Sequence, residues 1–285
     1  MKPVLQIEFI RYFLLTRPYS WLSVSFVAVL ASIFVNNGVL FPEILIDLIF
    51  GILVWISANL FAERLSRDMV ERGKIFLPIP VFLFVLAVLI AIFRNPLVLL
   101  VLLFILIALF IYGTKNKFYF IGQISFFIRG LMEFFLFISI LLFYNFQFVS
   151  TEWLYLLFWV YFITCGRNLV GDLRDIKYDK KTLPKSIGVL PSRIVVLILY
   201  LFPLIFGGLF LISHLVALLL IIFFKEFYNL HKALVLVNMF IFFELAVYLV
   251  SKELLVVTAF LFFGILLSLL YDKVPRKSNP FENKK

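Results

Sequence analysis

Residues 167–184, RNLVGDLRDIKYDKKTLP, are the most informative stretch of the chain, because this charged segment lies between two long apolar runs. It contains three aspartates, Asp172, Asp175 and Asp179, together with five Lys or Arg residues. Charged side chains are costly in the hydrocarbon core of a bilayer. If the flanking runs cross a membrane, the segment lies at the membrane surface, and its three carboxylates need an explanation there.

The composition of the whole chain indicates a membrane protein. Of the 285 residues, 64% are hydrophobic and 15% are charged, and the mean hydropathy of +1.13 is far above that of soluble domains. A chain of this length is filled by membrane spans and short connections, which leaves no room for a separate water-soluble catalytic domain. We therefore expect one all-α domain over residues 1–285, a polytopic transmembrane helical bundle.

The chain has few residues for soft metal sites. Cys165 is the single cysteine, so a disulfide or a cysteine-based metal site within one chain is excluded, and two histidines, His214 and His231, are too few for a histidine cluster. Any bound metal must therefore be held by oxygen atoms. The formal charge of +10 is a possible sign of nucleic-acid binding, but the basic residues follow membrane topology, so we expect no nucleic-acid partner.

Apolar segments of about 20 residues mark the spans. We place ten of them, bounded by charges, Pro and Gly, at residues 20–38, 43–62, 77–93, 97–113, 122–145, 152–170, 190–211, 213–228, 233–250 and 253–271. The segment at 213–228 is short for a span, so it either crosses or forms a re-entrant element. The expectation is nine or ten spans.

The basic residues predict the orientation of these spans. With the N-terminus in the cytoplasm, every Lys and Arg of the 26 falls on the cytoplasmic side except Arg94, Arg129 and Lys252. This bias obeys the positive-inside rule. We expect a multi-pass protein of the cell membrane with cytoplasmic charged loops, and residues 272–285 form a basic cytoplasmic tail.

The aspartates of the opening stretch have a one-sided spacing. Asn168, Asp172, Asp175 and Asp179 lie at i, i+4, i+7 and i+11, which places them on one stripe if the preceding span continues as a helix, with Arg167, Arg174 and Lys181 pointing elsewhere. Like charges on one face repel, so a compensating cation is expected, and Mg²⁺ suits a few carboxylates combined with phosphate oxygens. The alternative is a solvated helix end that neighbouring Lys and Arg residues neutralise.

A second cytoplasmic loop follows the span at 43–62. Asn59 and Glu63 are four residues apart and share a helix face, whereas Asp68 falls on the other side of a continued helix. The loop therefore offers one well-placed carboxylate. The alternative is a cluster of capping and interfacial charges.

Three parts of the sequence resemble the UbiA superfamily of intramembrane prenyltransferases. GDLRDIKYDKKTLPKSIG, residues 171–188, resembles the Asp-rich motif that follows the sixth helix of that family. LLTRPYSW, residues 14–21, resembles the start of its first helix, and YGTKNK, residues 112–117, resembles the Tyr and Lys pair after its fourth helix. The resemblance covers the chain from about residue 15 to 250.

The resemblance implies a bundle around a central cavity in which Mg²⁺ holds the diphosphate of a polyprenyl donor. It further implies an enzyme that transfers the prenyl group to a lipid-soluble or amphiphilic acceptor in the membrane. It implies catalytic roles for Asn59, Glu63, Asp172, Asp175 and Asp179, and all of these except Asn59 are the expected metal ligands. The expected substrate-binding residues are Lys117, Lys115, Tyr112, Arg129, Asn168 and Arg17, of which Lys117 is the first choice as a direct diphosphate cation.

The first motif departs from the family pattern. Where the family has Asn-Asp with further aspartates, this chain has Asn59 and Leu60, then Glu63 and Arg67. An alternative function is therefore a catalytically weakened homologue that binds an isoprenoid or other lipid, or that supports a membrane complex. A transporter is a third class, but no inverted repeat or Gly/Pro-broken helix pair favours it.

Some charged residues lie deep within the expected spans. Arg129 and Glu133 are four residues apart, and Glu244 lies near the middle of a later span. Charges at this depth face the bundle interior and find partners. They either contact the substrates, with a glutamate orienting or deprotonating the acceptor, or Arg129 and Glu133 form a structural ion pair.

Overall fold

The computed structural model describes residues 13–14, 16–38, 42–65, 78–148, 151–207, 211–249 and 254–273. These residues form twelve α-helices and one short 3-10 helix, and the described parts of the chain contain no β-strand. The all-α prediction is therefore confirmed. The helices are α2 Pro18–Asn36, α3 Glu43–Leu65, α4 Pro78–Arg94, α5 Val98–Gly113, α6 Tyr119–Gln123, α7 Ser125–Phe143, α8 Glu152–Arg174, α9 Leu183–Ile187, α10 Val189–Gly207, α11 Ile212–Phe223, α12 Phe227–Leu249 and α13 Leu254–Ser268, followed by η2 Tyr271–Lys273.

Ten of these helices correspond in order to the ten expected apolar segments. Five of them, α2, α3, α7, α8 and α12, are long and apolar enough to cross a membrane, and four more, α4, α5, α10 and α11, are shorter apolar helices. Helix α11 has only 12 residues, in agreement with the short segment expected at this position. The short helices α6 and α9 are additions, and they lie in the connections after α5 and α8.

Local sequence explains where several helices begin and end. Pro18 and Pro184 lie in the first turns of α2 and α9, where a missing N–H costs no hydrogen bond. Helix α2 ends at Asn36, and the cap residue Asn37 has a left-handed backbone with φ of 50° and an N–H that donates to the carbonyl oxygen of Ile33. Asparagine tolerates this conformation better than most residues, so it terminates the helix.

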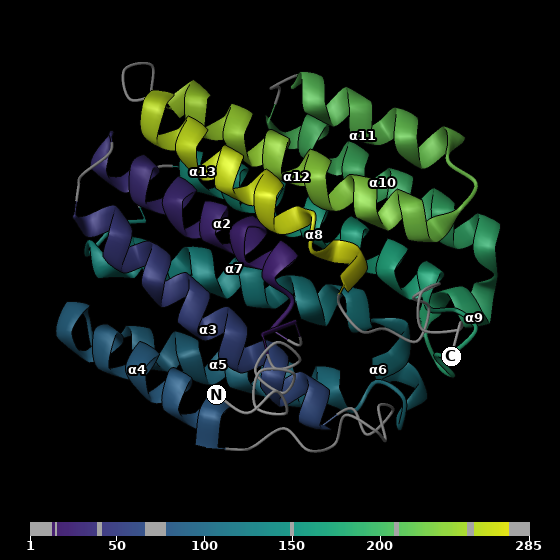
Figure 1. The fold of residues 1–285 in the computed structure, drawn as a ribbon, viewed down its shortest axis with the longest axis horizontal. Helices are drawn as coiled ribbons and strands as arrows, with labels where there is room; N and C mark the ends of the chain where they lie inside the picture. The colour runs from purple at the N-terminus through teal and green to yellow at the C-terminus, as the bar shows by residue number, and fades with distance from the viewer. Residues whose placement is uncertain are drawn as a thin grey trace, which may run out of the picture.

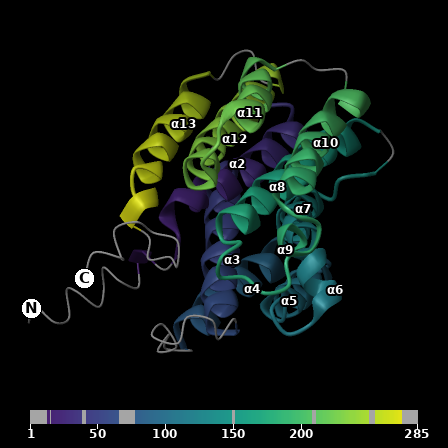
Figure 2. The same ribbon diagram turned by 90° about the vertical axis from the view of Figure 1, so that its right-hand side faces the viewer.

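The long helices lie side by side in a bundle with α2, α7 and α8 in its interior (Figure 1). Helix α2 packs against α3, α7, α12 and α13, while α8 packs against α7, α10 and α12. Helices α4 and α5 cover one side of the bundle, and α10, α11 and α13 lie on the other side (Figure 2). The core of large apolar side chains therefore follows α2, α7 and α8 along the bundle.

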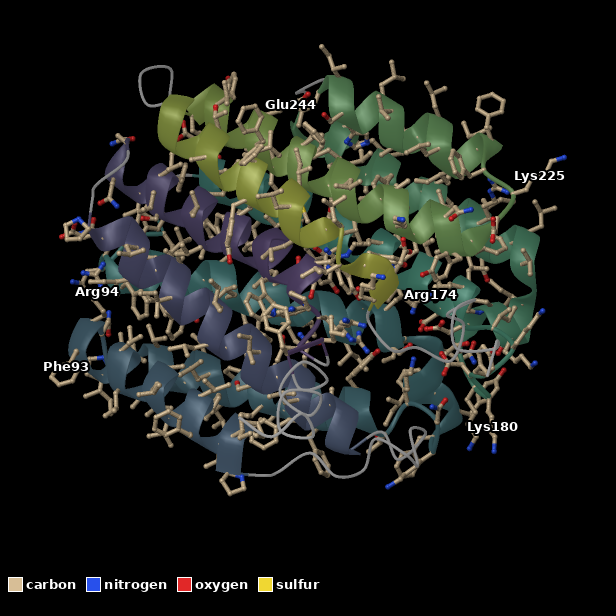
Figure 3. The ribbon with its side chains drawn as sticks, in the orientation of Figure 1. Phe93, Arg94, Arg174, Lys180, Lys225 and Glu244 are labelled. Atoms are coloured by element: carbon tan, nitrogen blue, oxygen red, sulfur yellow. The ribbon has the colours of Figure 1, made fainter. Side chains whose placement is uncertain are left out.

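The outer surface of the bundle is apolar. Phe93 is 86% exposed, and Ile205 and Phe223 are 74% and 72% exposed. Large apolar patches of this kind are avoided on soluble monomers, and here they face the lipid of an integral membrane protein. Charged residues gather toward the bundle ends, with Arg94 at one end and Lys180 and Lys225 at the other (Figure 3).

Candidate active site

A cavity with a volume of about 110 Å³ lies at one end of the bundle. Helices α2, α7 and α12 begin around it, and α3, α5 and α8 end there. The charged residues that line it are Arg17, Lys115, Arg129, Arg167, Arg174, Asp172, Asp175 and Asp179. Basic residues outnumber acidic ones in this lining, so the cavity is suited to an anion.

The four residues of the expected stripe all line this cavity, but only two of them lie in a helix. Helix α8 includes Asn168 and Asp172 and ends at Arg174. Beyond it the chain forms a turn, in which the N–H of Asp179 donates to the carbonyl oxygen of Asp175 at 3.0 Å. The helix on which the one-sided stripe depends therefore ends at Arg174, and the turn that follows brings the last two aspartates back toward the bundle.

Lys115 connects two of the aspartates. Its Nζ donates to Oδ1 of Asp172 at 3.2 Å and to Oδ2 of Asp179 at 3.1 Å. Ser125 at the start of α7 donates its hydroxyl to the other oxygen of Asp172 at 3.1 Å. Both aspartates are less than a tenth exposed, so the two carboxylates converge on one cation in a mostly buried site.

The pKa values reflect this arrangement. Burial lowers the pKa of Lys115, but attraction to Asp172 and to its other neighbours outweighs burial and raises this pKa well above its usual value. Burial raises the pKa of the Asp179 carboxyl, and the negative charges of Asp172 and Asp175 also raise it against the opposing effect of Lys115. The cation is therefore held firmly, while Asp179 accepts a proton more readily than an exposed aspartate.

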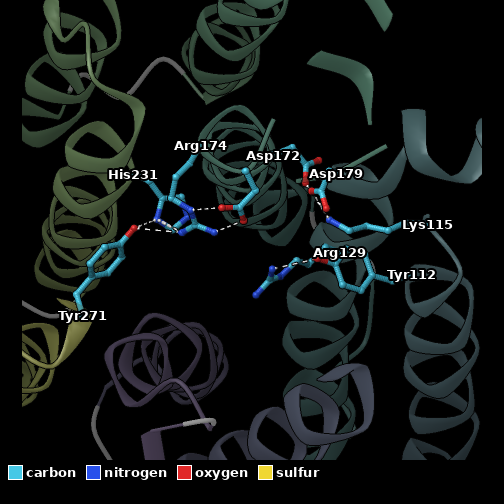
Figure 4. A network of polar contacts seen from close by, with 9 residues as sticks. Tyr112, Lys115, Arg129, Asp172, Arg174, Asp179, His231 and Tyr271 are labelled. Atoms are coloured by element: carbon cyan, nitrogen blue, oxygen red, sulfur yellow. Dashed lines mark hydrogen bonds and ion pairs between the residues drawn. The ribbon is translucent and has the colours of Figure 1, made fainter. Parts of the chain in front are cut away.

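Asp175 pairs with a different cation, Arg174, which lies beside His231 and Tyr271 (Figure 4). Arg174 donates from Nε to Oδ1 of Asp175 at 2.8 Å and from Nη2 to Oδ2. The guanidinium also donates from Nη1 to the hydroxyl of Tyr271 at 3.2 Å, and Nη1 lies 3.4 Å from Nδ1 of His231. Residues from α8, α12 and η2 thus meet beside the cavity.

The buried ion pair of α7 differs from the one considered from the sequence. Arg129 donates to the hydroxyl of Tyr112 at 3.3 Å, and its guanidinium lies 5.9 Å from the ring centre of Trp55. Glu133 is completely buried and accepts from Arg167 of α8 at 2.6 Å. The hypothesis of an Arg129–Glu133 ion pair is therefore wrong, because the neighbouring helix supplies the cation. Arg129 remains in the cavity lining.

The structure corrects the prediction for Arg167 and Arg174. From the sequence we expected both side chains to point away from the aspartates. They line the cavity together with the aspartates. Their positions follow from their partners, because Glu133 on α7 and the capping residue Asp175 draw the two guanidinium groups toward the bundle.

The remaining predicted residues lie at or beyond the cavity edge. Asn59 lines a small adjoining pocket that shares Arg17 and Tyr112 with the main cavity, and its amide donates to the carbonyl oxygen of Trp55 at 3.0 Å. Lys117 is exposed and is not among the lining residues. Lys115, and not the expected Lys117, is therefore the lysine placed to contact a diphosphate in the cavity. The side chain of Glu63 and all of Arg67 lie outside the described residues.

Glu244 is remote from this site. Its carboxylate accepts from the backbone N–H of Ser213 at 3.2 Å and from the hydroxyl of the same serine at 2.8 Å. Since α12 begins beside the cavity at Phe227, Glu244 lies roughly 25 Å along that helix at 1.5 Å per residue. This residue therefore anchors the start of α11 rather than contacting a substrate in the cavity.

Sequence reasoning did not find some of the lining residues. Tyr19, Trp55 and His231 contribute to the cavity from three different helices. Tyr19 lies within the stretch that resembles the family, so a signal existed for it. Trp55 sits inside an apolar segment and His231 lies in the connection between the segments at 213–228 and 233–250. No motif surrounds either residue, so only packing reveals their positions.

No protein-family model matches the sequence, and no curated protein is similar to it. Solved structures do match. A UbiA homologue from Archaeoglobus fulgidus bound to GPP and Mg²⁺ has 17% identity and a TM-score of 0.52, with 93% of this chain and 99% of that chain covered. The apo structure of a UbiA homologue from Aeropyrum pernix K1 has 14% identity and a TM-score of 0.53, with coverages of 88% and 98%.

A digeranylgeranylglyceryl phosphate synthase is a further match, with 18% identity, a TM-score of 0.52 and coverages of 92% and 98%. These matches extend over nearly the full length of each chain, so they concern the whole bundle rather than a few helices. The chain therefore has the fold of the UbiA homologues, as the sequence resemblance predicts.

Proposed function

We propose that the protein is a prenyltransferase of the UbiA superfamily, which moves a polyprenyl group from its diphosphate to a lipid-soluble or amphiphilic acceptor. One observation carries the proposal: two buried carboxylates, Asp172 and Asp179, converge on a single cation in a cavity whose lining also includes four arginines. Such a site suits a divalent ion together with a diphosphate. The relatives with GPP and Mg²⁺, or with DMAPP and Mg²⁺, support the same chemistry.

The residues present fit Mg²⁺. Mg²⁺ is commonly held in proteins by one or two carboxylates, several waters and substrate phosphate oxygens. Asp172 and Asp179 each direct one oxygen at the ammonium of Lys115. The same two oxygens are therefore placed to bind Mg²⁺ in place of the ammonium. Among the described residues no group of three Asp, Glu, His or Cys side chains is placed to hold a metal ion, so Asp172 and Asp179 would hold Mg²⁺ only together with phosphate and water oxygens. Asp175 is the further candidate ligand.

In the proposed reaction, the bond between the allylic carbon and the diphosphate oxygen breaks, and its electron pair leaves with the diphosphate. A nucleophilic atom of the acceptor forms the new bond to that carbon and then releases its proton to the leaving diphosphate. Bound Mg²⁺ supplies positive charge that stabilises the leaving diphosphate. Arg17 and Arg129 add fixed positive charge around the same space, where charge develops in the transition state.

The lining residues also orient the donor. Arg129 lies against the rings of Trp55 and Tyr112, with its guanidinium carbon 5.9 Å and 5.6 Å from their centres. Cation–π contact with two rings limits the positions of this guanidinium. Arg129 and Tyr112 are thus prepared to hold the diphosphate while the prenyl chain extends into the apolar bundle.

The proposal includes the topology predicted from the sequence. The single domain spans residues 1–285, the cavity opens to the cytoplasm and residues 272–285 form a basic cytoplasmic tail. The distribution of Lys and Arg supports this orientation, because Lys180 and Lys225 lie at the cavity end of the bundle (Figure 3).

Replacement of Asp175 tests the proposed function. In detergent with Mg²⁺, geranylgeranyl diphosphate and mixed acceptors, Asp175→Ala should lose prenyl transfer and pyrophosphate release while keeping its gel-filtration profile. The matched control is Lys225→Ala, an exposed residue outside the cavity lining. Full turnover by Asp175→Ala would exclude a catalytic role for this carboxylate.

The alternative is a homologue that binds an isoprenoid diphosphate without turnover. The specific observation in its favour is that Asp172, Asp175 and Asp179 all pair with cations of the protein itself. This alternative predicts Mg²⁺-dependent binding of a non-hydrolysable prenyl diphosphate analogue with no pyrophosphate released from any natural donor. Mass spectrometry of co-purified lipids identifies the bound class in either case.

A further inference from the structure

We propose that the 3-10 turn after α13 belongs to the site, and that the hydroxyl of Tyr271 is a positioning group that holds Arg174 against Asp175. This inference rests on the proposed function. Tyr271 is 97 positions from Arg174 in the sequence, and no motif connects them. Helix α13 packs against α2 and α12 and thereby carries the turn to the cavity end of the bundle.

The contacts form a chain from the turn to the carboxylate (Figure 4). The hydroxyl of Tyr271 accepts from Nη1 of Arg174 at 3.2 Å and lies 2.6 Å from Nδ1 of His231. Arg174 in turn donates to both oxygens of Asp175 from two different nitrogens. A guanidinium that binds both oxygens of a carboxylate fixes its plane as well as its position.

Tyr271 acts on the cavity through another residue. Asp175, Arg174 and His231 line the cavity, whereas Tyr271 is not part of the lining and is only 1% exposed. Its ring packs edge-on against Tyr19, with the ring centres 4.9 Å apart. The ring therefore contributes packing, and the hydroxyl is the group directed at Arg174.

Loss of this hydroxyl should free one end of the guanidinium. Arg174 is mostly buried, so an Nη1 that loses this acceptor turns toward Nδ1 of His231, which lies 3.4 Å away, and the orientation of Asp175 changes with it. Residues that orient metal-binding or substrate-binding groups typically change affinity by about 10-fold to 100-fold when they are replaced. The effect should fall on binding of the donor rather than on the folded structure.

Tyr228 provides a matched control. Its hydroxyl donates to Oδ1 of Asp272 in the same turn at 2.9 Å, and its ring centre lies 5.6 Å from that of Tyr271. Tyr228→Phe therefore loosens the turn by one hydrogen bond, but it keeps the hydroxyl to which Arg174 donates. Both Tyr→Phe variants remove a single oxygen atom from a ring beside the same turn.

The experiment compares the wild type, Tyr271→Phe and Tyr228→Phe in one detergent. Binding of Mn²⁺ with inorganic pyrophosphate is followed by electron paramagnetic resonance, and kcat and KM are measured with geranylgeranyl diphosphate. Tyr271→Phe should weaken pyrophosphate binding and raise the donor KM by about 10-fold while kcat changes less, and Tyr228→Phe should leave both within about 2-fold. In an Arg174→Lys background, Tyr271→Phe should have no further effect, because the bidentate contact is already lost.

Other outcomes overturn the inference. Equal effects of the two Tyr→Phe variants would show that Tyr271 contributes only packing. Failure of Tyr271→Phe to yield folded protein would lead to the same conclusion. Additive losses with Arg174→Lys would show that the hydroxyl acts independently of the guanidinium. If the wild type neither binds Mn²⁺ with pyrophosphate nor transfers a prenyl group, the proposed function fails first, and the role of Tyr271 fails with it.

Discussion

Replacement of Lys115 by Met is the most informative perturbation of this site. The substitution keeps a flexible side chain of similar length but removes the ammonium that joins Asp172 to Asp179. Ser125 still donates to Asp172, whereas Asp179 loses the cation that opposes the rise of its pKa. Two mostly buried carboxylates then face each other.

The expected loss of stability follows from this burial. Removal of one partner from a buried ion pair typically costs about 3–5 kcal/mol, because the other charge is left buried without compensation. The side chains of Asp172 and Asp179 are each 9% exposed, and protonation of one of them relieves part of the repulsion. We therefore expect the free energy of unfolding of Lys115→Met to fall by about 3 kcal/mol at neutral pH, near the lower end of that range.

A divalent ion should reverse this loss. At a concentration one hundred times its dissociation constant, a ligand that binds only the folded state stabilises it by about 2.7 kcal/mol. In the wild type, Mn²⁺ must displace the ammonium of Lys115 from the same two oxygens, so Mn²⁺ should bind more tightly to Lys115→Met. Pyrophosphate release should nevertheless fall by about 100-fold, because a cation near the leaving group is lost.

The assay is unfolding in mixed micelles with increasing SDS, with and without Mn²⁺, for the wild type, Lys115→Met and Lys180→Met. Lys180 is the control because it is exposed and lies outside the cavity lining. If Lys115→Met unfolds at the same SDS fraction as the wild type and Mn²⁺ stabilises the two equally, the ammonium does not bind where a metal would. The proposed ligand pair would then be refuted.

Two further predictions concern the support of the site. Glu133→Gln removes the negative charge that neutralises a buried guanidinium of α8, so the free energy of unfolding should fall by about 3–5 kcal/mol in the same SDS titration; an unchanged midpoint would contradict the buried ion pair. Gly122→Ala places a methyl group 2.3 Å from the carbonyl oxygen of Lys181, so α6 must move away from the connection after α8 and the donor KM should rise. Gly38→Ala is its control, since that methyl group meets no atom within 4 Å, and equal KM values for the two variants would show that this close approach does not matter.

Sequence patterns predicted the helical elements well because membrane helices depend on local composition. Each apolar segment must satisfy its own backbone hydrogen bonds in lipid, so hydropathy and helix breakers such as Pro18 and Asn37 are enough to locate it. The same patterns left the course of the chain beyond Arg174 open, and there the structure has a turn instead of the continued helix on which the stripe depended. At that point the chain leaves the lipid, and tertiary contacts rather than local composition decide its course.

For the candidate site too, the sequence and the tertiary structure each determine a different part. The sequence by itself determined which residues are available, since the spacing and the resemblance identified Asp172, Asp175 and Asp179 before any partner was known. Only the tertiary structure decided their partners: Lys115 rather than Lys117 reaches the aspartates, and Tyr271 reaches Arg174 from the far end of the sequence. Such pairings depend on distances between helices that are remote in the chain, and a buried charge binds the opposite charge that packing brings nearest.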